Sequence, residues 1–147
     1  MYNCELVFFI LVILIFTLFI LRIKGSLETF RNPKSITLKV KTARDRQIGL
    51  MYVKKPLKEN HGLLFDYGKY VIQGFWMKNT YIPLDIIYLD HKYKVLDYSK
   101  NLIPKSEETI KIDKPFRYAI EVNAKTIKKN KIKKDDYIKL VFVKNIN

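Results

Sequence analysis

The chain has 147 residues, a formal net charge of +14 and a single cysteine. This length suits one domain, and one cysteine excludes a scaffold held together by disulfides. No Cys/His cluster has the spacing of a structural zinc module, and a hydrophobic content of 48% excludes disorder by composition. We therefore expect one domain whose core is stabilised by packing.

The positive charge is carried almost entirely by lysine. Only five of the 28 basic residues are arginines, the side chain that grips phosphate bidentately. A lysine-rich solvated surface explains this composition better than a nucleic-acid site, so we expect no specific nucleic-acid partner. Attraction to anionic lipid remains open.

The N-terminal segment is strongly apolar. Residues Leu6 to Leu21 contain no charge, and insertion of such a run into lipid is favoured by several kcal/mol. As a helix it spans roughly 24 Å, which suffices only if the flanking residues help. We predict a single-pass transmembrane anchor over residues 1–24 with the bilayer as partner; the competing interpretation is a cleaved signal peptide. The side of the membrane that the domain occupies stays undetermined.

Residues 25–34 are predicted to form a linker, because Gly25, Ser26 and Asn32-Pro33 disfavour a continued helix. After it, short β-branched and aromatic segments alternate with turn residues, with one short helix expected after Thr42 and another, capped by Asn123, over 124–129. The predicted strands cover 36–40, 63–65, 70–77, 84–89, 93–98, 116–122 and 137–143.

These elements contain no βαβ alternation and no heptad repeat. Residues 35–147 are therefore predicted to be a mostly β domain, a small antiparallel sandwich or barrel-like fold with one or two short helices, preceded by the transmembrane helix.

Several motifs taken together resemble the family called domain of unknown function 192. They are Gly49-Leu50-Met51, Leu57, Gly62 to Phe65, Phe75 to Thr80, Ile82 to Asp85, Pro104, Glu121 to Ala124 and Asp136. The resemblance covers roughly residues 36–141. It implies a small mostly β fold that is commonly exported or membrane-attached in prokaryotes, with no established biochemical activity.

The chain departs from the family pattern at a few positions. The family usually has methionine where Leu63 stands and glycine where Lys125 and Asp135 stand, and many members carry a cysteine pair soon after the proline that corresponds to Pro104. The missing cysteines remove any redox inference drawn from the family.

The aromatic motif beside Gly74 allows two interpretations. Phe75, Trp76 and Met77 could form the floor of a ligand cleft, or they could belong to the core. We favour the core, so that Trp76→Ala would cost about 3 to 5 kcal/mol. The residues that we consider for a ligand cleft are Met51, Phe75, Trp76, Met77, Lys78, Asn79, Thr80, Asp85 and Glu121.

Asp85 and Glu121 are carboxylates within otherwise apolar strands. As an acid/base pair they would have to face one cleft at about 5 to 9.5 Å, as in a small hydrolase. The alternative, which we favour, is neutralisation of each by Lys78, Arg46 or backbone N–H groups. Asn79 and Thr80 are expected to satisfy backbone groups in the turn before Pro83.

No recognisable enzyme motif is present, and we lean against catalysis. Met51, Met77 and His61 could offer soft ligands to Cu(I), but the third methionine is replaced by Leu63, so we expect neither a metal nor a cofactor. The prediction is a membrane-anchored binding or accessory module with a small-molecule or protein partner. The alternative is the hydrolase based on Asp85 and Glu121.

Overall fold

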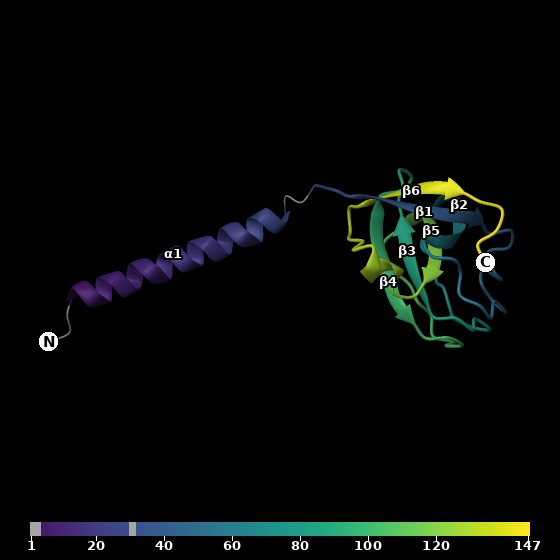
Figure 1. Cartoon of the computed structure of the whole chain (residues 1–147), viewed down its shortest axis with the longest axis horizontal. Helices are drawn as coiled ribbons and strands as arrows, with labels where there is room; N and C mark the ends of the chain where they lie inside the picture. The colour runs from purple at the N-terminus through teal and green to yellow at the C-terminus, as the bar shows by residue number, and fades with distance from the viewer. Residues whose placement is uncertain (1–3, 30–31) are drawn as a thin grey trace. The chain divides into compact units, whose positions relative to one another are not determined.

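The computed structural model describes residues 4–29 and 32–147, so parts of the expected anchor (1–3) and linker (30–31) lie outside the described residues. The chain divides into two compact units, residues 1–32 and 33–147. The first contains helix α1 (Cys4–Thr29) (Figure 1). Within the described part of the chain, no helix combines the length and the apolar content needed to cross a membrane.

Helix α1 extends further than the sequence suggested. It continues through Gly25 and Ser26 to Thr29, where we expected the linker to have begun. A glycine inside a helix costs only about 1 kcal/mol relative to alanine, so it does not by itself end a helix. The helix therefore does not end at Gly25 and Ser26, where we expected it to end.

The second unit is mostly β, as predicted. Its strands form one six-stranded sheet in the order β4-β3-β5-β2-β1-β6. The elements are β1 (Ser35–Thr42), β2 (His61–Val71), β3 (Leu84–Leu89), β4 (Val95–Leu102), β5 (Phe116–Asn123), α2 (Thr126–Lys129) and β6 (Tyr137–Phe142) (Figure 1).

The sheet is mixed, which corrects the expected antiparallel sandwich. Strand β1 runs parallel to both β2 and β6, whereas β2, β3, β4 and β5 pair antiparallel. The two outer strands approach each other at one end, because Lys94, just before β4, pairs with Tyr137 of β6, and the Val95 N–H donates to the Asp136 carbonyl at 2.8 Å. The sheet therefore curls into a half-barrel.

Each face of the sheet is covered by a different layer. One face, here called the helix face, carries Ile87 and Leu89 of β3 and packs against Ile127 of α2. The other, here called the loop face, carries Leu84, Ile86 and Tyr88 and is covered by residues from irregular segments, among them Leu50, Leu57, Phe75 and Ile82. Because side chains alternate along a strand, neighbouring residues of β3 and β5 point to different layers.

Two predicted elements differ from the structure. Residues 70–77 are not one strand: β2 ends at Val71, and after it only Phe75 forms an isolated bridge, to Ile110. No helix follows β1; turns extend from residue 46, and the Asp45 carboxylate accepts the backbone N–H groups of Gln47 and Ile48 at 2.7 and 3.4 Å. Local hydrogen bonds of this kind compete with helix formation.

Helix α2 begins without the cap that the sequence suggested. The Asn123 side chain instead bonds the backbone of Leu57. Its Oδ1 accepts the Leu57 N–H at 2.9 Å, and its Nδ2 donates to the Leu57 carbonyl at 2.7 Å. The backbone of Lys125 is left-handed, with φ 71°, and so is that of Asp135, with φ 69°. Glycine adopts this conformation without steric strain, which accounts for the glycines that the resemblance led us to expect at both positions.

Candidate functional site

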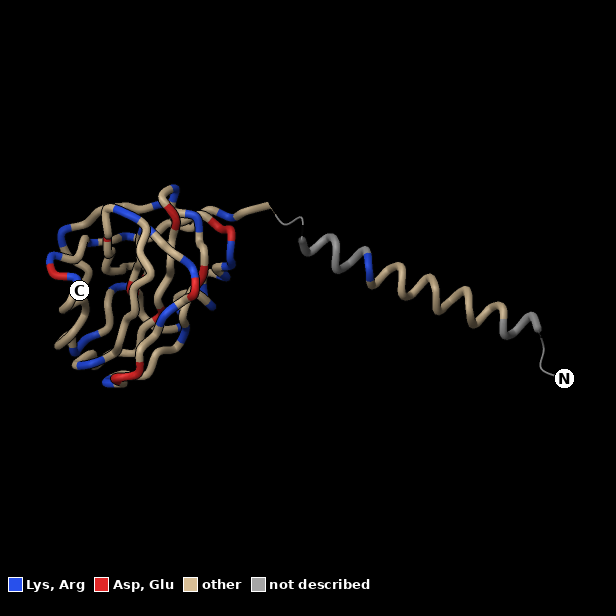
Figure 2. Tube along the Cα trace, turned by 180° about the vertical axis from the view of Figure 1, so that it is seen from behind, with Lys and Arg blue, Asp and Glu red and all other residues tan. Residues whose placement is uncertain are grey.

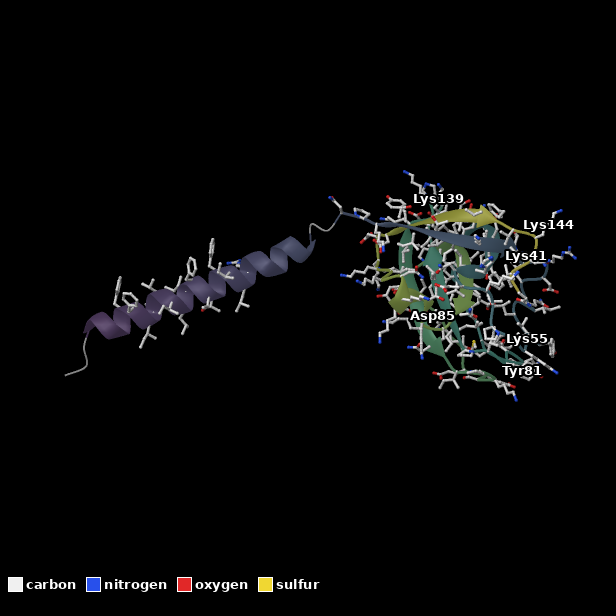
Figure 3. All side chains as sticks on the ribbon, viewed as in Figure 1. Lys41, Lys55, Tyr81, Asp85, Lys139 and Lys144 are labelled. Carbon is white, nitrogen blue, oxygen red and sulfur yellow. The ribbon has the colours of Figure 1, made fainter. Side chains whose placement is uncertain are left out.

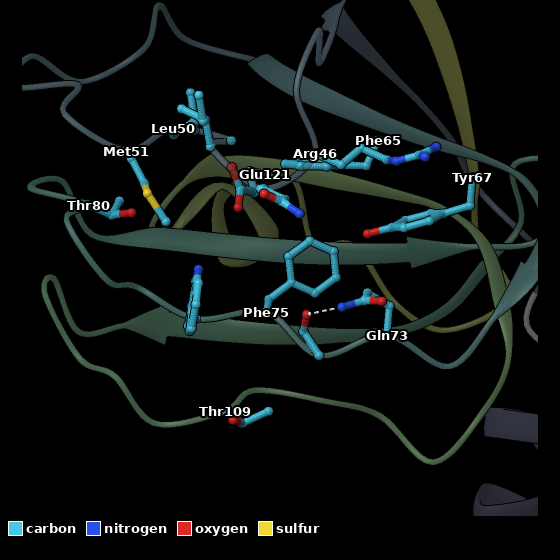
Figure 4. A pocket seen from close by; sticks show the side chains of 15 residues that line it. Arg46, Leu50, Met51, Phe65, Tyr67, Gln73, Phe75, Thr80, Thr109 and Glu121 are labelled. Carbon is cyan, nitrogen blue, oxygen red and sulfur yellow. Dashed lines mark hydrogen bonds between the residues drawn. The ribbon is translucent and has the colours of Figure 1, made fainter.

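A cleft of about 810 Å³ opens on the loop face of the sheet (Figure 4). Its size lies within the range of small-molecule sites, roughly 300 to 1,000 Å³. The lining residues come from the segment after β1, from β2, from the segment after β2, from the segment between β4 and β5, and from β5. They are Arg46, Gln47, Ile48, Gly49, Leu50, Met51, Phe65, Tyr67, Gln73, Gly74, Phe75, Trp76, Thr80, Thr109 and Glu121.

The turn after β1 forms one wall, and Gly49 brings it close to the sheet. Gly49 has φ +52°, and a Cβ built there would lie 3.2 Å from both Glu121 Oε2 and Phe65 Cζ. Both the backbone conformation and the space favour glycine at this position. The absence of a side chain lets the backbone of residues 49–51 pass directly over the Glu121 carboxyl group.

The segment after β2 forms the opposite wall. Phe75 exchanges backbone hydrogen bonds with Ile110, both at 2.8 Å, which fixes a segment that is otherwise irregular. The Phe75 ring packs edge to face against Phe65 and Tyr88, with centroid separations of 5.5 and 5.8 Å. The floor of the cleft is therefore aromatic and rigid.

The three residues of the aromatic motif have different environments. Phe75 and Met77 are buried, as expected for core residues, but Trp76 is 49% exposed. Its ring lies at the cleft, and the Lys78 ammonium group sits 5.6 Å from the ring centroid. The core assignment of Trp76 is wrong, because the segment is not a strand and the indole has no layer to pack under.

Glu121 is the chemically distinctive residue of the cleft. It is only 6% exposed, and its Oε2 has no hydrogen-bond partner. Burial raises the pKa of Glu121 to about 8. The Leu50 backbone N–H acts in the opposite direction and lowers the pKa, because its hydrogen bond favours the charged form. Figure 4 shows the carboxyl group between Leu50 and Phe75, inside the cleft.

The other buried carboxylates of residues 32–147 have their oxygens bonded. Asp136 accepts the backbone N–H groups of Lys34 and Lys133, at 2.9 and 2.8 Å. Asp85 accepts those of Asn101 and Ile127, at 2.8 and 3.0 Å. A buried carboxyl oxygen without a partner, as in Glu121, is the exception in a folded protein and calls for an explanation.

Two further polar residues that line the cleft are Tyr67 and Arg46. Burial raises the pKa of Tyr67 to about 12, so its hydroxyl group keeps its proton at neutral pH. The Arg46 guanidinium carbon lies 5.4 Å from the Tyr67 ring centroid, and Arg46 Nη1 donates to the Asp66 carbonyl at 3.0 Å. Arg46 is thus held by the Tyr67 ring and the Asp66 carbonyl.

Asp85 and Glu121 do not share a cleft. In the pairing of β3 with β5, Asp85 lies opposite Val122 and Ile86 opposite Glu121. Directly opposed residues point to the same face, so Asp85 points to the helix face with Val122 and Glu121 to the loop face with Ile86. The two carboxyl groups therefore cannot act together on one substrate, as the hydrolase interpretation requires. The expected neutralisation of Asp85 by backbone N–H groups is confirmed.

The remaining expected cleft residues divide into two groups. Met51 and Thr80 line the cleft, whereas Met77, Lys78 and Asn79 do not. Asn79 Nδ2 donates to the Tyr52 hydroxyl at 3.1 Å, and Lys78 pairs with Glu107 at 3.6 Å. No three His, Cys, Asp or Glu side chains of the described ranges are grouped so that they could hold a metal ion.

The sequence did not lead us to expect most residues of the wall formed by the turn after β1, nor Tyr67. Gly49 and Leu50 stood within the family motif, but their motif membership did not reveal that they cover Glu121. Tyr67 and Gln73 carried no distinguishing signal in the sequence. Arg46 was considered only as a partner for Asp85 or Glu121. In the structure its guanidinium group instead donates to the Asp66 carbonyl.

The fold and the cleft define a small mostly β protein with a carboxyl-bearing cleft on the loop-covered face of its half-barrel. The model of the DUF192 family, described as an uncharacterized ACR, matches residues 27–140. The chain therefore belongs to the DUF192 family. No curated protein matches the chain.

Two solved structures are similar to this chain. One is a protein from Sinorhizobium meliloti 1021, named as a candidate transcription regulator, with 33% identity over 67% of this chain and 76% of that chain and a TM-score of 0.62. The other is a protein of unknown function from Novosphingobium aromaticivorans DSM 12444, with 28% identity over 70% of this chain and 71% of that chain and a TM-score of 0.60.

Proposed function

We propose that this protein is a binding module that holds a small organic ligand in the cleft above Glu121. The single observation that carries the proposal is the unpartnered Oε2 of Glu121 inside a cleft of ligand size. Burying a polar group without a hydrogen bond costs several kcal/mol. A ligand that supplies this bond would offset this penalty.

The walls of the cleft support the same proposal. Phe65, Phe75 and Trp76 offer apolar surface, and Gln73, Thr80 and Thr109 add a few polar groups. Predominantly apolar walls with a small number of polar groups are typical of ligand sites. Glu121 faces the cleft without a second carboxylate, which supports binding over the hydrolase alternative.

Trp76→Ala is expected to weaken ligand binding while leaving the domain folded. Because Trp76 is half exposed, its removal should lower the free energy of unfolding by about 1 kcal/mol, in contrast to about 3 to 5 kcal/mol for a fully buried tryptophan. Urea unfolding gives the stability. Amide chemical shifts of the ¹⁵N-labelled chain, recorded against a library of aromatic fragments, give the binding.

Tyr81→Ala is the matched control. Tyr81 is 40% exposed, carries Lys105 at 5.1 Å from its ring centroid, as Trp76 carries Lys78, and does not line the cleft (Figure 3). The control should retain fragment binding. If no fragment shifts the amides of Gly49, Leu50 or Gly74, or if both variants bind like the wild type, the binding proposal fails.

We also propose that residues 1–24 hold the domain at a lipid bilayer. The observation that favours this is the exposure of the apolar side chains of α1, which ranges from 47% at Ile20 to 69% at Phe9 among those that are described. Apolar surface of this extent is stabilised by lipid.

Removal of residues 1–32 is expected to release the protein from membranes. The full chain should float with membrane vesicles in a density gradient and resist an alkaline carbonate wash, whereas residues 33–147 should remain at the bottom. Flotation separates membrane attachment from aggregation. Full chain that stays at the bottom of the gradient would refute attachment through this segment.

A further inference from the structure

Glu121 is an acidic residue without a cation in a strongly basic protein. Lysine and arginine residues are spread over the whole domain (Figure 2). Acidic residues at the surface attract them: Asp66 pairs with Arg117 at 2.6 Å, and Asp97 pairs with Lys134 at 2.7 Å. Within residues 32–147, no basic side chain forms an ion pair with Glu121.

The one basic residue among those that line the cleft makes its contacts with other groups. Arg46 lines the cleft, but its guanidinium group donates to the Asp66 carbonyl and packs over the Tyr67 ring. These two contacts fix the orientation of Arg46. Within residues 32–147, no side chain bonds Glu121 Oε2, so this oxygen is available to a ligand.

The surfaces around this position are those that favour a cation. The Phe65, Tyr67, Phe75 and Trp76 rings all line the cleft, and Met51 adds a polarizable thioether. Aromatic faces attract cationic nitrogen through their quadrupole, and the attraction is stronger where water is excluded. A carboxyl group among aromatic rings recognises positive charge more strongly than either feature alone.

We infer, on the basis of the ligand-binding function proposed above, that the ligand is an organic cation whose protonated nitrogen donates to Glu121 Oε2 and whose apolar body packs against the aromatic walls. The bond is charge-assisted, so it is shorter and stronger than a neutral hydrogen bond. In this complex Glu121 is ionised. Its proton leaves to solvent as the cation enters, so the charge within the cleft stays balanced.

This exchange makes cation binding depend on pH. The titratable and charged groups around Glu121 are Tyr67 of β2, Tyr88 of β3 and Arg46 of the turn after β1. Burial raises the pKa of both tyrosines to about 12 and that of Glu121 to about 8, so of these three groups Glu121 alone titrates near neutrality. Cation affinity should rise by up to about tenfold per pH unit below pH 8 and level off above it.

Benzamidinium and benzamide provide a matched pair of probes. They have nearly the same planar shape, but the first is a cation at all pH values used and the second is neutral. The full chain, ¹⁵N-labelled in detergent micelles, is titrated with each probe at about pH 6 and about pH 8.5, with amide shifts of Gly49, Leu50 and Gly74 as the readout. We expect benzamidinium to bind at least about tenfold more tightly than benzamide at the higher pH.

Glu121→Gln should abolish both the preference for the cation and its pH dependence. Glu107→Gln, which removes the same charge at an exposed position, should change neither. The pH dependence of the wild type is a second test that needs no variant. Benzamide binding as tightly as benzamidinium would overturn the cation and leave the binding function standing. The inference of a cationic ligand would also be overturned if the benzamidinium affinity did not rise with pH, or if neither probe bound.

Discussion

Glu121→Gln is expected to remove a large pH dependence from the stability of the domain. The pKa of Glu121 is raised in the folded protein to about 8, from 4.5 in the unfolded chain. Above pH 4.5 the unfolded chain releases this proton while the folded protein holds it, so the wild type loses stability as the pH rises to 8. The glutamine variant has no proton to lose. Its free energy of unfolding should therefore gain about 3 to 4 kcal/mol relative to the wild type between about pH 5 and about pH 8.

Urea unfolding of both proteins at the two pH values measures this difference. Glu107→Gln, at an exposed position, is the control and should stay parallel to the wild type. A glutamine variant that also runs parallel to the wild type would mean that Glu121 is already ionised near pH 5. The empty cleft would then hold a charge that its surroundings stabilise, and the basis for a ligand that compensates it would be lost.

The strands were largely predictable because their burial follows their residue pattern. Ile36, Leu38 and Val40 alternate with polar residues and are buried in β1, and β3, which is apolar except for Asp85, is buried at every position. Pairing was not predictable in the same way. The parallel contacts of β1 with β2 and β6 join segments far apart in the chain, and no local pattern encodes them.

The limits of sequence reasoning are clearest in the two carboxylates. Asp85 and Glu121 look equivalent in the sequence, since each interrupts an apolar strand. Their environments differ because of the register between β3 and β5, in which Asp85 lies opposite Val122 and not opposite Glu121. Asp85 therefore lies under α2, and Glu121 lies under the turn at Gly49. Trp76 was misassigned for a related reason, because hydrophobicity alone does not tell whether another layer covers a side chain.

Asp85→Ala is expected to destabilise the domain severely without affecting the cleft. Asp85 is 1% exposed, and its two oxygens accept the N–H groups of Asn101, at the end of β4, and Ile127, in α2 (Figure 3). Alanine removes the acceptor of both donors and leaves the buried Ile127 N–H unpaired. We expect a loss of about 3 to 5 kcal/mol in the free energy of unfolding.

Asp85→Asn separates this structural role from a role in binding. Asparagine keeps one carbonyl oxygen, so it can satisfy one of the two donors and should lose about half as much stability as alanine. The folded fraction of this variant should bind the fragments of the cleft as the wild type does, because Asp85 and Glu121 lie on opposite faces of the sheet. Urea unfolding gives the first quantity and amide shift titration the second. A stable Asp85→Ala protein that loses fragment binding would place Asp85 in the site and reverse this assignment.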